Sequence, residues 1–254
     1  MFSEGKFLWN FKFSQISYWW IASFDLSNDF RIRRFFKGIY GIRPNLPKYE
    51  MTWDPSIVLN YLEKQINSEL KLQDLTQKTL VLLLLATGQR IQSIASIEYQ
   101  NITETADGIN IKIPKRLKTS GRNKYQPNIS IPSFHNNKQL CVADAVKLYL
   151  IKTSNSRNAL TNNLFMTHKK PFKNASSQTL SRWVKNVLDK SGIDTKIFTA
   201  YSTRHAATSA AARKGVSIDV IRQSAGWSEK SGTFARFYLR PLHSNHFSQV
   251  VLNC

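Results

Sequence analysis

The sequence has few cysteines, few acidic residues and no long hydrophobic run. Its two cysteines, Cys141 and Cys254, support neither a disulfide framework nor a zinc site made of cysteines, and they fit a reducing compartment. The most apolar stretch near the N-terminus, residues 16–24, is far too short to cross a bilayer and lacks a convincing signal-peptide cleavage pattern. These absences predict a soluble intracellular protein that has no membrane partner.

Basic residues greatly outnumber acidic ones. The chain has 36 Lys and Arg against 16 Asp and Glu, a net charge of +20. Such an excess repels itself unless a polyanion neutralises it, so nucleic acid is the leading class of partner. A basic but inert surface and an anionic membrane are the alternatives. The length of 254 residues and the hydrophobic content of 42% are enough for a real core, which argues against disorder throughout.

The hydrophobic pattern predicts a mostly α fold with one small β-sheet or hairpin, an α+β class. Asp54 as an N-cap and Pro55 in the first turn begin one helix. Residues 80–86 are apolar all round and end at Gly88, which predicts a central buried helix. A short helix followed by a linker is expected within residues 30–48, and further helices are expected over 91–97, 142–150 and 177–190. Alternating isoleucines predict two strands, at residues 109–113 and 129–131, on either side of a basic loop.

Residues 199–239 carry the most informative pattern. Three short helical segments are expected here, separated at Gly215 and Gly226, and they hold Arg204, Trp227 and Tyr238 in that order. A guanidinium fork matches two phosphate oxygens, an indole N–H is a donor, and a phenol is a nucleophile. The pattern therefore suits the binding of a phosphodiester and its attack by a phenol. The structural alternatives are an arginine in a surface salt bridge and aromatic residues that only pack in the core.

Two further groups of basic residues stand out. Arg90 is expected at the start of the short amphipathic helix 91–97, on the turn between two packed elements. The loop of residues 114–128 contains no acid, and its basic residues are expected to contact DNA phosphates. They are Lys115, Arg116, Lys118, Arg122 and Lys124.

Four segments resemble the tyrosine recombinase (phage integrase) superfamily. They are ATGQRIQSIASI, LKTSG, YSTRHAATSAAARKG and AGWSEKSGTFARFY, and the similarity runs from about residue 52 to residue 239. The sequences of these motifs most resemble those of the recombinases of Crypton and DIRS-type mobile elements. The resemblance implies a tyrosine recombinase catalytic domain over residues 51–254. Residues 1–50 would then be a truncated or unrecognisable remnant of the helical core-binding domain, with its linker.

The same resemblance assigns roles to the candidate catalytic residues. Arg90 and Arg204 would hold the scissile phosphate, Trp227 would donate to a phosphate oxygen, and Tyr238 would be the nucleophile. Lys118 would be the general acid that protonates the departing 5′ oxygen. Phosphate binding by the whole loop is the rival interpretation of Lys118, with Lys115 or Lys124 as the acid instead.

Two positions depart from the usual pattern of the family. Tyr201 stands where a histidine is usual, and Ser93 stands where an acidic residue often supports that histidine. A phenol can hydrogen-bond a phosphate but is a weaker base near pH 7. Tyr201 is therefore included as a site residue and Ser93 as support at most. His205 is expected to point to a different side of its helix.

The implied reaction is a transesterification through a 3′-phosphotyrosyl intermediate, which needs neither ATP nor a metal or other cofactor. The sequence has no P-loop motif and no clear cluster of metal ligands. Double-stranded DNA would be the partner, bound by a homo-tetramer on paired sites that exchanges a C-terminal segment, residues 240–254. A mobile-element recombinase would act in the nucleus. The rival functions are a catalytically impaired relic that only binds DNA and a type IB topoisomerase-like enzyme.

Overall fold

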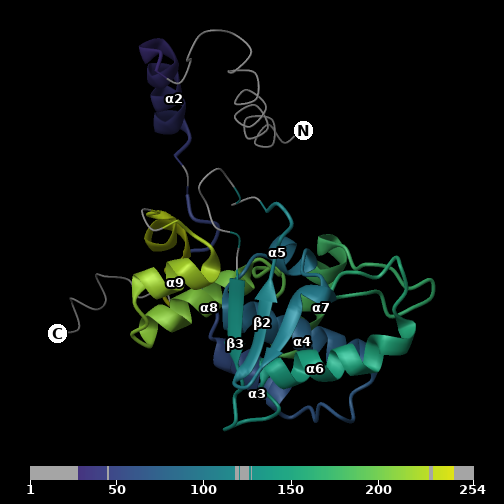
Figure 1. The fold of residues 1–254 in the computed structure, drawn as a ribbon. Helices are drawn as coiled ribbons and strands as arrows, with labels where there is room; N and C mark the ends of the chain where they lie inside the picture. Colours follow the sequence, from purple (N-terminus) through teal and green to yellow (C-terminus); the bar gives the residue numbers. More distant parts are fainter. Residues whose placement is uncertain are drawn as a thin grey trace, which may run out of the picture. The chain divides into compact units, whose positions relative to one another are not determined.

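The structure, a computed structural model, describes residues 28–44, 46–117, 120, 126, 128–228 and 231–242. Contacts divide the chain into two compact units, Met1–Leu46 and Pro47–Cys254. In the first unit the described element is α2 (Phe30–Ile42), whose N-cap Asp29 accepts a hydrogen bond from the Arg31 backbone N–H (2.8 Å). No residue of α2 is buried. Figure 1 shows the elements of each unit.

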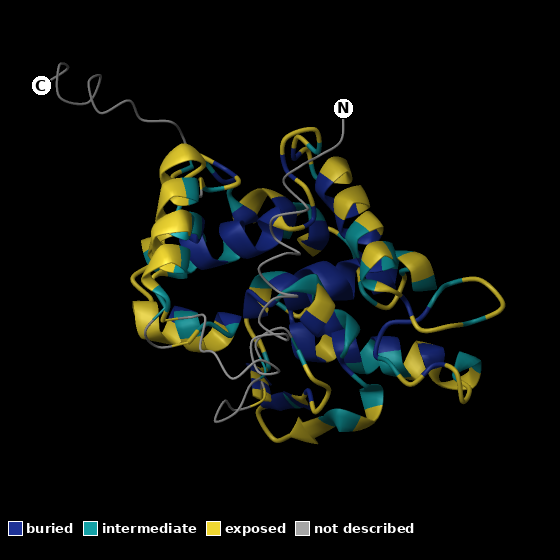
Figure 2. Ribbon diagram, turned by 90° about the horizontal axis from the view of Figure 1, so that it is seen from above, coloured by how far each residue is buried: buried dark blue, intermediate teal, exposed yellow. Residues whose placement is uncertain are grey.

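The second unit is organised around α4 (Leu72–Thr87), which is buried on nearly every side. It packs against α6 (Val142–Thr153), α7 (Ser177–Lys190) and α8 (Ser202–Arg213). Figure 2 shows the buried residues gathered on the inner faces of these helices. The predicted central buried helix is confirmed, and it begins before the apolar run. Polar side chains in its first turns are tolerated because they have partners: Thr76 Oγ1 donates to the Leu72 carbonyl and Lys78 Nζ to the Gln65 carbonyl.

An antiparallel sheet of three strands lies beside these helices, in the order β1 (Ile102–Thr105), β2 (Gly108–Lys112) and β3 (Asn128–Pro132). The register pairs Ile109 with Ile131 and Ile111 with Ile129, so the alternating isoleucines form the buried face. The pattern revealed β2 and β3 but missed β1. All but one residue of β1 is exposed, and none is buried, so the strand carries no hydrophobic alternation. The predicted fold class, mostly α with a small sheet, is confirmed.

Short helices complete the second unit. The helix α3 begins after Asp54, whose side chain accepts from the Ser56 backbone N–H, as the sequence predicts. A small second hydrophobic cluster of Ile221, Phe234 and Tyr238 lies apart from the main core. Among the described helices, none combines the length and the apolar character that a membrane span needs. The short elements are α3 (Pro55–Glu63), α5 (Ile91–Ala95), η1 (Tyr99–Asn101), η2 (Ser154–Ser156), α9 (Ile218–Ala225) and the π-helix η3 (Phe234–Tyr238).

Candidate active site

Arg204 is the buried centre of the site. It lies in the first turn of α8 with 1% of its surface exposed, and its Nη1 donates to the carbonyls of Gly88 (2.9 Å) and Ala225 (2.8 Å). Gly88 and Gly226 adopt positive φ angles, 60° and 70°, and end α4 and α9. The carbonyls at two helix ends, which lack partners within their own helices, thus converge on one guanidinium.

Arg204 keeps donors that the protein does not use. Its Nε and Nη2 are buried and have no hydrogen-bond partner among the described residues. Burial and the nearby charge of Arg90 lower the pKa of Arg204 to about 9, so the group stays charged at neutral pH. A buried cation with free N–H groups is costly unless an anion completes it. This arrangement suits a phosphate oxygen.

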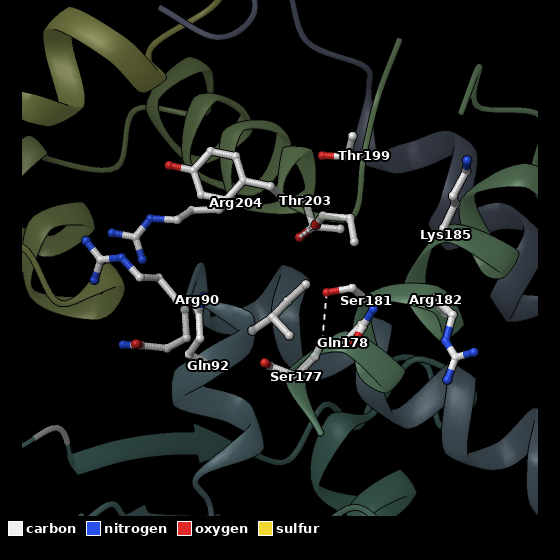
Figure 3. Close-up of a pocket in the computed structure, with 14 residues that line it drawn as sticks. Arg90, Gln92, Ser177, Gln178, Ser181, Arg182, Lys185, Thr199, Thr203 and Arg204 are labelled. Atoms are coloured by element: carbon white, nitrogen blue, oxygen red, sulfur yellow. Dashed lines mark hydrogen bonds between the residues drawn. The ribbon is translucent and has the colours of Figure 1, made fainter. Parts of the chain in front are cut away.

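Arg90 is the N-cap of α5 and lies at the edge of a cavity of about 410 Å³. The start of α5, the first turns of α7 and residues 199–204 line this cavity. Figure 3 shows the guanidinium groups of Arg90 and Arg204 at the same end of it, with Arg182 and Lys185 on the opposite side. The part of the lining that the structure describes includes no acidic residue. The cavity is therefore an anion site by its charge.

Tyr238 and Tyr201 meet through their hydroxyl groups, which form a hydrogen bond. Tyr238, at the end of η3, is only 5% exposed, whereas Tyr201, at the start of α8, is 40% exposed and lines the cavity. Burial, together with the hydrogen bond to Tyr238, raises the pKa of the Tyr201 phenol. Ser209, on α8, donates to the Tyr238 carbonyl (2.7 Å) and so ties η3 to the helix of Arg204. The nucleophile candidate is thus held beside the arginine pair.

Trp227 packs against both the arginine and the tyrosine. The Arg204 Cζ lies 3.9 Å from the centroid of the Trp227 ring, and the Trp227 and Tyr238 rings meet edge to face at 4.7 Å. The Trp227 Nε1 is buried and has no partner among the described residues, so a donor remains available next to the guanidinium. Packing and donation are compatible in this position.

His205 contradicts the sequence interpretation. It was expected to point away, yet its ring stacks on Tyr238 at 4.2 Å with an interplanar angle of 17°. Tyr201 lies four residues earlier, and positions i and i+4 share one face of a helix, so both rings reach the same tyrosine. This spacing was the signal that could have identified His205. Both ring nitrogens of His205 are buried without a partner among the described residues.

His205→Gln is expected to make folding less sensitive to acid. Burial, with the charges of Arg240, Arg204 and Lys48, lowers the pKa of His205 from 6.5 to about 3. Between these values the unfolded chain binds a proton that the folded chain does not. The stability from the neutral ring is therefore present above pH 6.5 and falls below it, by about 2 kcal/mol at pH 5. Urea unfolding at pH 7 and pH 5 measures this difference. His135→Gln, at an exposed histidine, should keep the full pH dependence; the same dependence in His205→Gln would contradict the argument.

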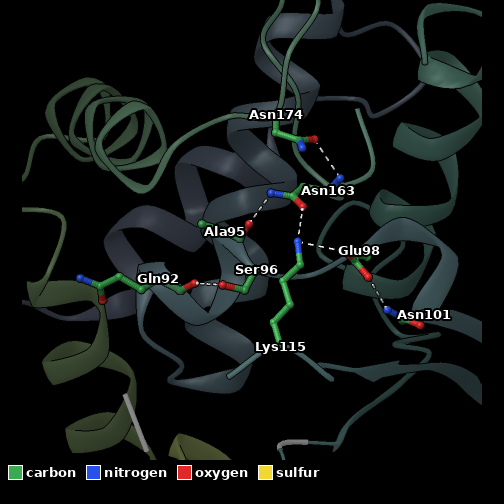
Figure 4. A network of polar contacts seen from close by, with 8 residues as sticks. All are labelled: Gln92, Ala95, Ser96, Glu98, Asn101, Lys115, Asn163 and Asn174. Carbon is green, nitrogen blue, oxygen red and sulfur yellow. Dashed lines mark hydrogen bonds and ion pairs between the residues drawn. The ribbon is translucent and has the colours of Figure 1, made fainter. Parts of the chain in front are cut away.

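Lys115 forms its polar contacts with other residues of this chain. Its Nζ forms an ion pair with Glu98 (2.9 Å) and donates to Asn163 Oδ1 (3.3 Å). Asn163 in turn donates to the Ala95 carbonyl (2.9 Å) at the end of α5, and Glu98 accepts from Asn101 (3.0 Å). Figure 4 shows this network. Lys115 thus ties the chain beyond β2 to the segment after α5, and a DNA contact by Lys115 stays a prediction.

The other predicted site residues are placed as follows. Arg116 is exposed, and Ser93 is buried in α5 with 5% of its surface exposed. Lys118, Arg122 and Lys124 lie outside the described residues, as does most of the segment 240–254. The structure brings together Arg90, Tyr201, Arg204, Trp227 and Tyr238. Within the described ranges no group of three or more His, Cys, Asp or Glu side chains is arranged to hold a metal ion.

Comparisons with known proteins agree with this architecture. A model described as the phage integrase family matches residues 59–244. The crystal structure of XerA recombinase superposes with a TM-score of 0.56 at 16% identity over 83% of this chain and 64% of that chain. The XerH site-specific recombinase bound to difH substrate gives 0.55 at 15% identity over 82% and 53%. The chain thus spans less than two thirds of either relative, and at this identity the likeness shows the fold. A search of curated protein sequences found no match.

Proposed function

This chain belongs to the phage integrase family, and on that premise we propose that it cleaves and rejoins double-stranded DNA through a covalent phosphotyrosyl intermediate. The observation that carries the proposal is the contact of Tyr238 with Tyr201, Trp227 and the guanidinium of Arg204. The Arg204 Cζ lies 5.3 Å from the centroid of the Tyr238 ring, although the two residues are far apart in the sequence.

Each residue has a chemical task in this reaction. Arg90 and Arg204 bind the scissile phosphate and stabilise the additional charge of the pentacoordinate transition state. Trp227 donates its indole N–H to a phosphate oxygen. Tyr238 attacks the phosphorus, and the neighbouring donors orient its phenol for that attack. Tyr201 hydrogen-bonds the Tyr238 hydroxyl and so orients it before attack.

The step balances without an energy source. The Tyr238 oxygen forms a bond to phosphorus as the bond to the 5′ oxygen breaks, the phenolic proton leaves to solvent, and Lys118 protonates the departing oxygen. The product is a 3′-phosphotyrosyl link and a free 5′ hydroxyl. A second 5′ hydroxyl then attacks the link and reverses the process on a new strand. Lys118 enters from the family resemblance, since it lies outside the described residues.

Finer assignments extend the same proposal. The amino-acid sequences of the motifs suggest a relationship to Crypton and DIRS-type elements, which would place the protein in the nucleus. Residues 51–254 would form the catalytic domain, and residues 1–50 would belong to the core-binding part and linker. A homo-tetramer on two paired duplexes would carry out the exchange. The basic residues Arg116, Arg122 and Lys124 would contact the DNA backbone.

Trapping of covalent adducts tests the proposal. We expect the protein to form an adduct that survives denaturant when it is mixed with a pool of nicked duplexes of randomised sequence, since loss of the short fragment beyond a nick prevents religation. Sequencing the trapped DNA identifies the site. A DNA-binding relic would bind the pool without forming an adduct. A topoisomerase-like enzyme would instead form adducts without sequence preference and relax supercoiled DNA.

A further inference from the structure

The start of the second unit is fastened to the candidate active site. The Tyr49 hydroxyl is hydrogen-bonded to Thr199 Oγ1 (2.8 Å) and accepts from the Thr199 backbone N–H (3.3 Å). Trp53 Nε1 donates to Ser202 Oγ in the first turn of α8 (2.8 Å). Tyr49 and Trp53 are both buried, at 6% and 5% exposure. We call residues 48–53 the strap. It is fixed in place against the residues that precede Arg204.

Lys48 begins the strap and lies at the rim of the cavity. Its Nζ donates to Thr199 Oγ1 (3.3 Å) and lies 5.4 Å from the centroid of the Tyr201 ring. Thr199 and Tyr201 both line the cavity. Lys48 is exposed, and no acidic side chain in the described ranges forms an ion pair with it. A long hydroxyl contact leaves two of the three ammonium donors of Lys48 available.

The charges around the cavity exceed what one phosphodiester needs. Arg90 and Arg204 already offer two positive charges to one negative phosphate at their end of the cavity, and Arg182 and Lys185 lie on the opposite side. Lys48 adds a further cation, in contact with Thr199 and Tyr201 of the lining. Lysine binds phosphate as a point charge and does not form the two-pronged arrangement that arginine does. A DNA strand presents a charge about every 3.4 Å along the helix axis, so neighbouring phosphates meet any surface that holds one of them.

We propose that Lys48 binds the phosphodiester next to the scissile one on the same strand and thereby fixes the register of DNA in the site. This inference rests on the proposed function, because it presumes DNA as the ligand. It assigns to the strap a direct part in substrate binding. The buried anchors Tyr49 and Trp53 supply the rigidity that a positioning contact requires.

Salt dependence of binding gives the first test. Binding of a labelled random-sequence duplex is measured in the Tyr238→Phe background, where no covalent step contributes. Each lost phosphate contact reduces the slope of log K against log salt by about 0.9, so the affinity advantage over Lys48→Met should shrink about 3-fold between 50 and 200 mM salt. Lys48→Arg should retain the original slope. Lys64→Met, at an exposed lysine outside the cavity lining, should keep the original slope within the error of the measurement.

Neutral phosphates locate the contact. A duplex selected for binding from a randomised pool is prepared with a methylphosphonate at the scissile position or at one of the neighbouring positions. The protein with Lys48 and the Lys48→Met variant should have equal affinity for the duplex with the methylphosphonate at one neighbouring position. Their affinities should differ for the duplexes modified at every other position. An equal difference at every position, or a constant ratio across salt, would overturn the inference. If the chain bound no duplex at all, the proposed function itself would fall, whereas binding with a Lys48-independent profile removes only this contact.

Discussion

Tyr238→Phe is expected to abolish the denaturant-resistant adduct, with a rate loss on the order of 10⁴-fold or more, because removal of a nucleophile leaves only the binding contribution to catalysis. The variant keeps the ring, so its stacking on His205 and its edge contact with Trp227 remain. We therefore expect the free energy of unfolding to change by no more than about 1.5 kcal/mol, the upper end of the range for loss of one hydrogen bond. Gel analysis of the trapped DNA and urea unfolding measure the two effects.

This experiment decides which of two tyrosines is the nucleophile. Two phenols share the site, and Tyr201 is the more exposed, at 40% against 5% for Tyr238. Tyr201→Phe is the matched control, since it removes the other half of the same hydrogen bond. It should slow adduct formation by about one order of magnitude, as expected for loss of an orienting hydrogen bond. An adduct that persists in Tyr238→Phe and disappears in Tyr201→Phe would reverse the assignment.

Arg204→Lys is expected to lower the rate of adduct formation by about 10² to 10³-fold. Lysine retains the charge but lacks the planar fork, so it cannot hold the carbonyls of Gly88 and Ala225 while it also offers two directed N–H groups to a phosphate. The loss should appear in single-turnover rates at saturating DNA. A rate within tenfold of the original would mean that the positive charge alone accounts for the contribution of Arg204 to the rate.

Arg213→Lys provides the comparison on the same helix. Arg213 is an exposed residue of α8 whose Nη1 donates to the Arg240 carbonyl (3.3 Å). Its replacement should leave the single-turnover rate within about twofold, since surface substitutions away from a site have small effects. Circular dichroism and urea unfolding of both variants separate a folding defect from a loss of transition-state stabilisation. A similar rate loss in both variants would indicate a general effect on α8.

The residues that sequence alone could predict are those whose chemistry is evident from type and order. Arg90, Arg204, Trp227 and Tyr238 have no common hydrophobic period, yet their side chains match the parts of a phosphoryl-transfer site. Their convergence depends on helix ends that the pattern does indicate, above all Gly88 at the end of α4. The hydrophobic pattern of the sequence likewise predicts the central helix and two of the three strands.

Other features depend on contacts that no periodicity encodes. His205 carries no hydrophobic signal of its own, and only its four-residue spacing from Tyr201 places its ring beside Tyr238. The strap residues are isolated polar and aromatic positions after a proline-rich segment, and their partners lie about 150 residues away in the sequence. The strand β1 is mostly exposed and was invisible to a hydrophobic pattern.

Two hydrogen bonds donated by backbone N–H groups constrain the C-terminal exchange between protomers that the proposed tetramer would make. The Thr52 N–H donates to the Pro241 carbonyl (2.9 Å), and the Arg240 N–H donates to Ser209 Oγ (3.0 Å). The chain is therefore moored to its own protomer for three residues past Tyr238. A crossover that leaves these bonds intact has its pivot after Pro241, so each protomer would keep its own nucleophile in cis while only the following residues pass to a neighbour.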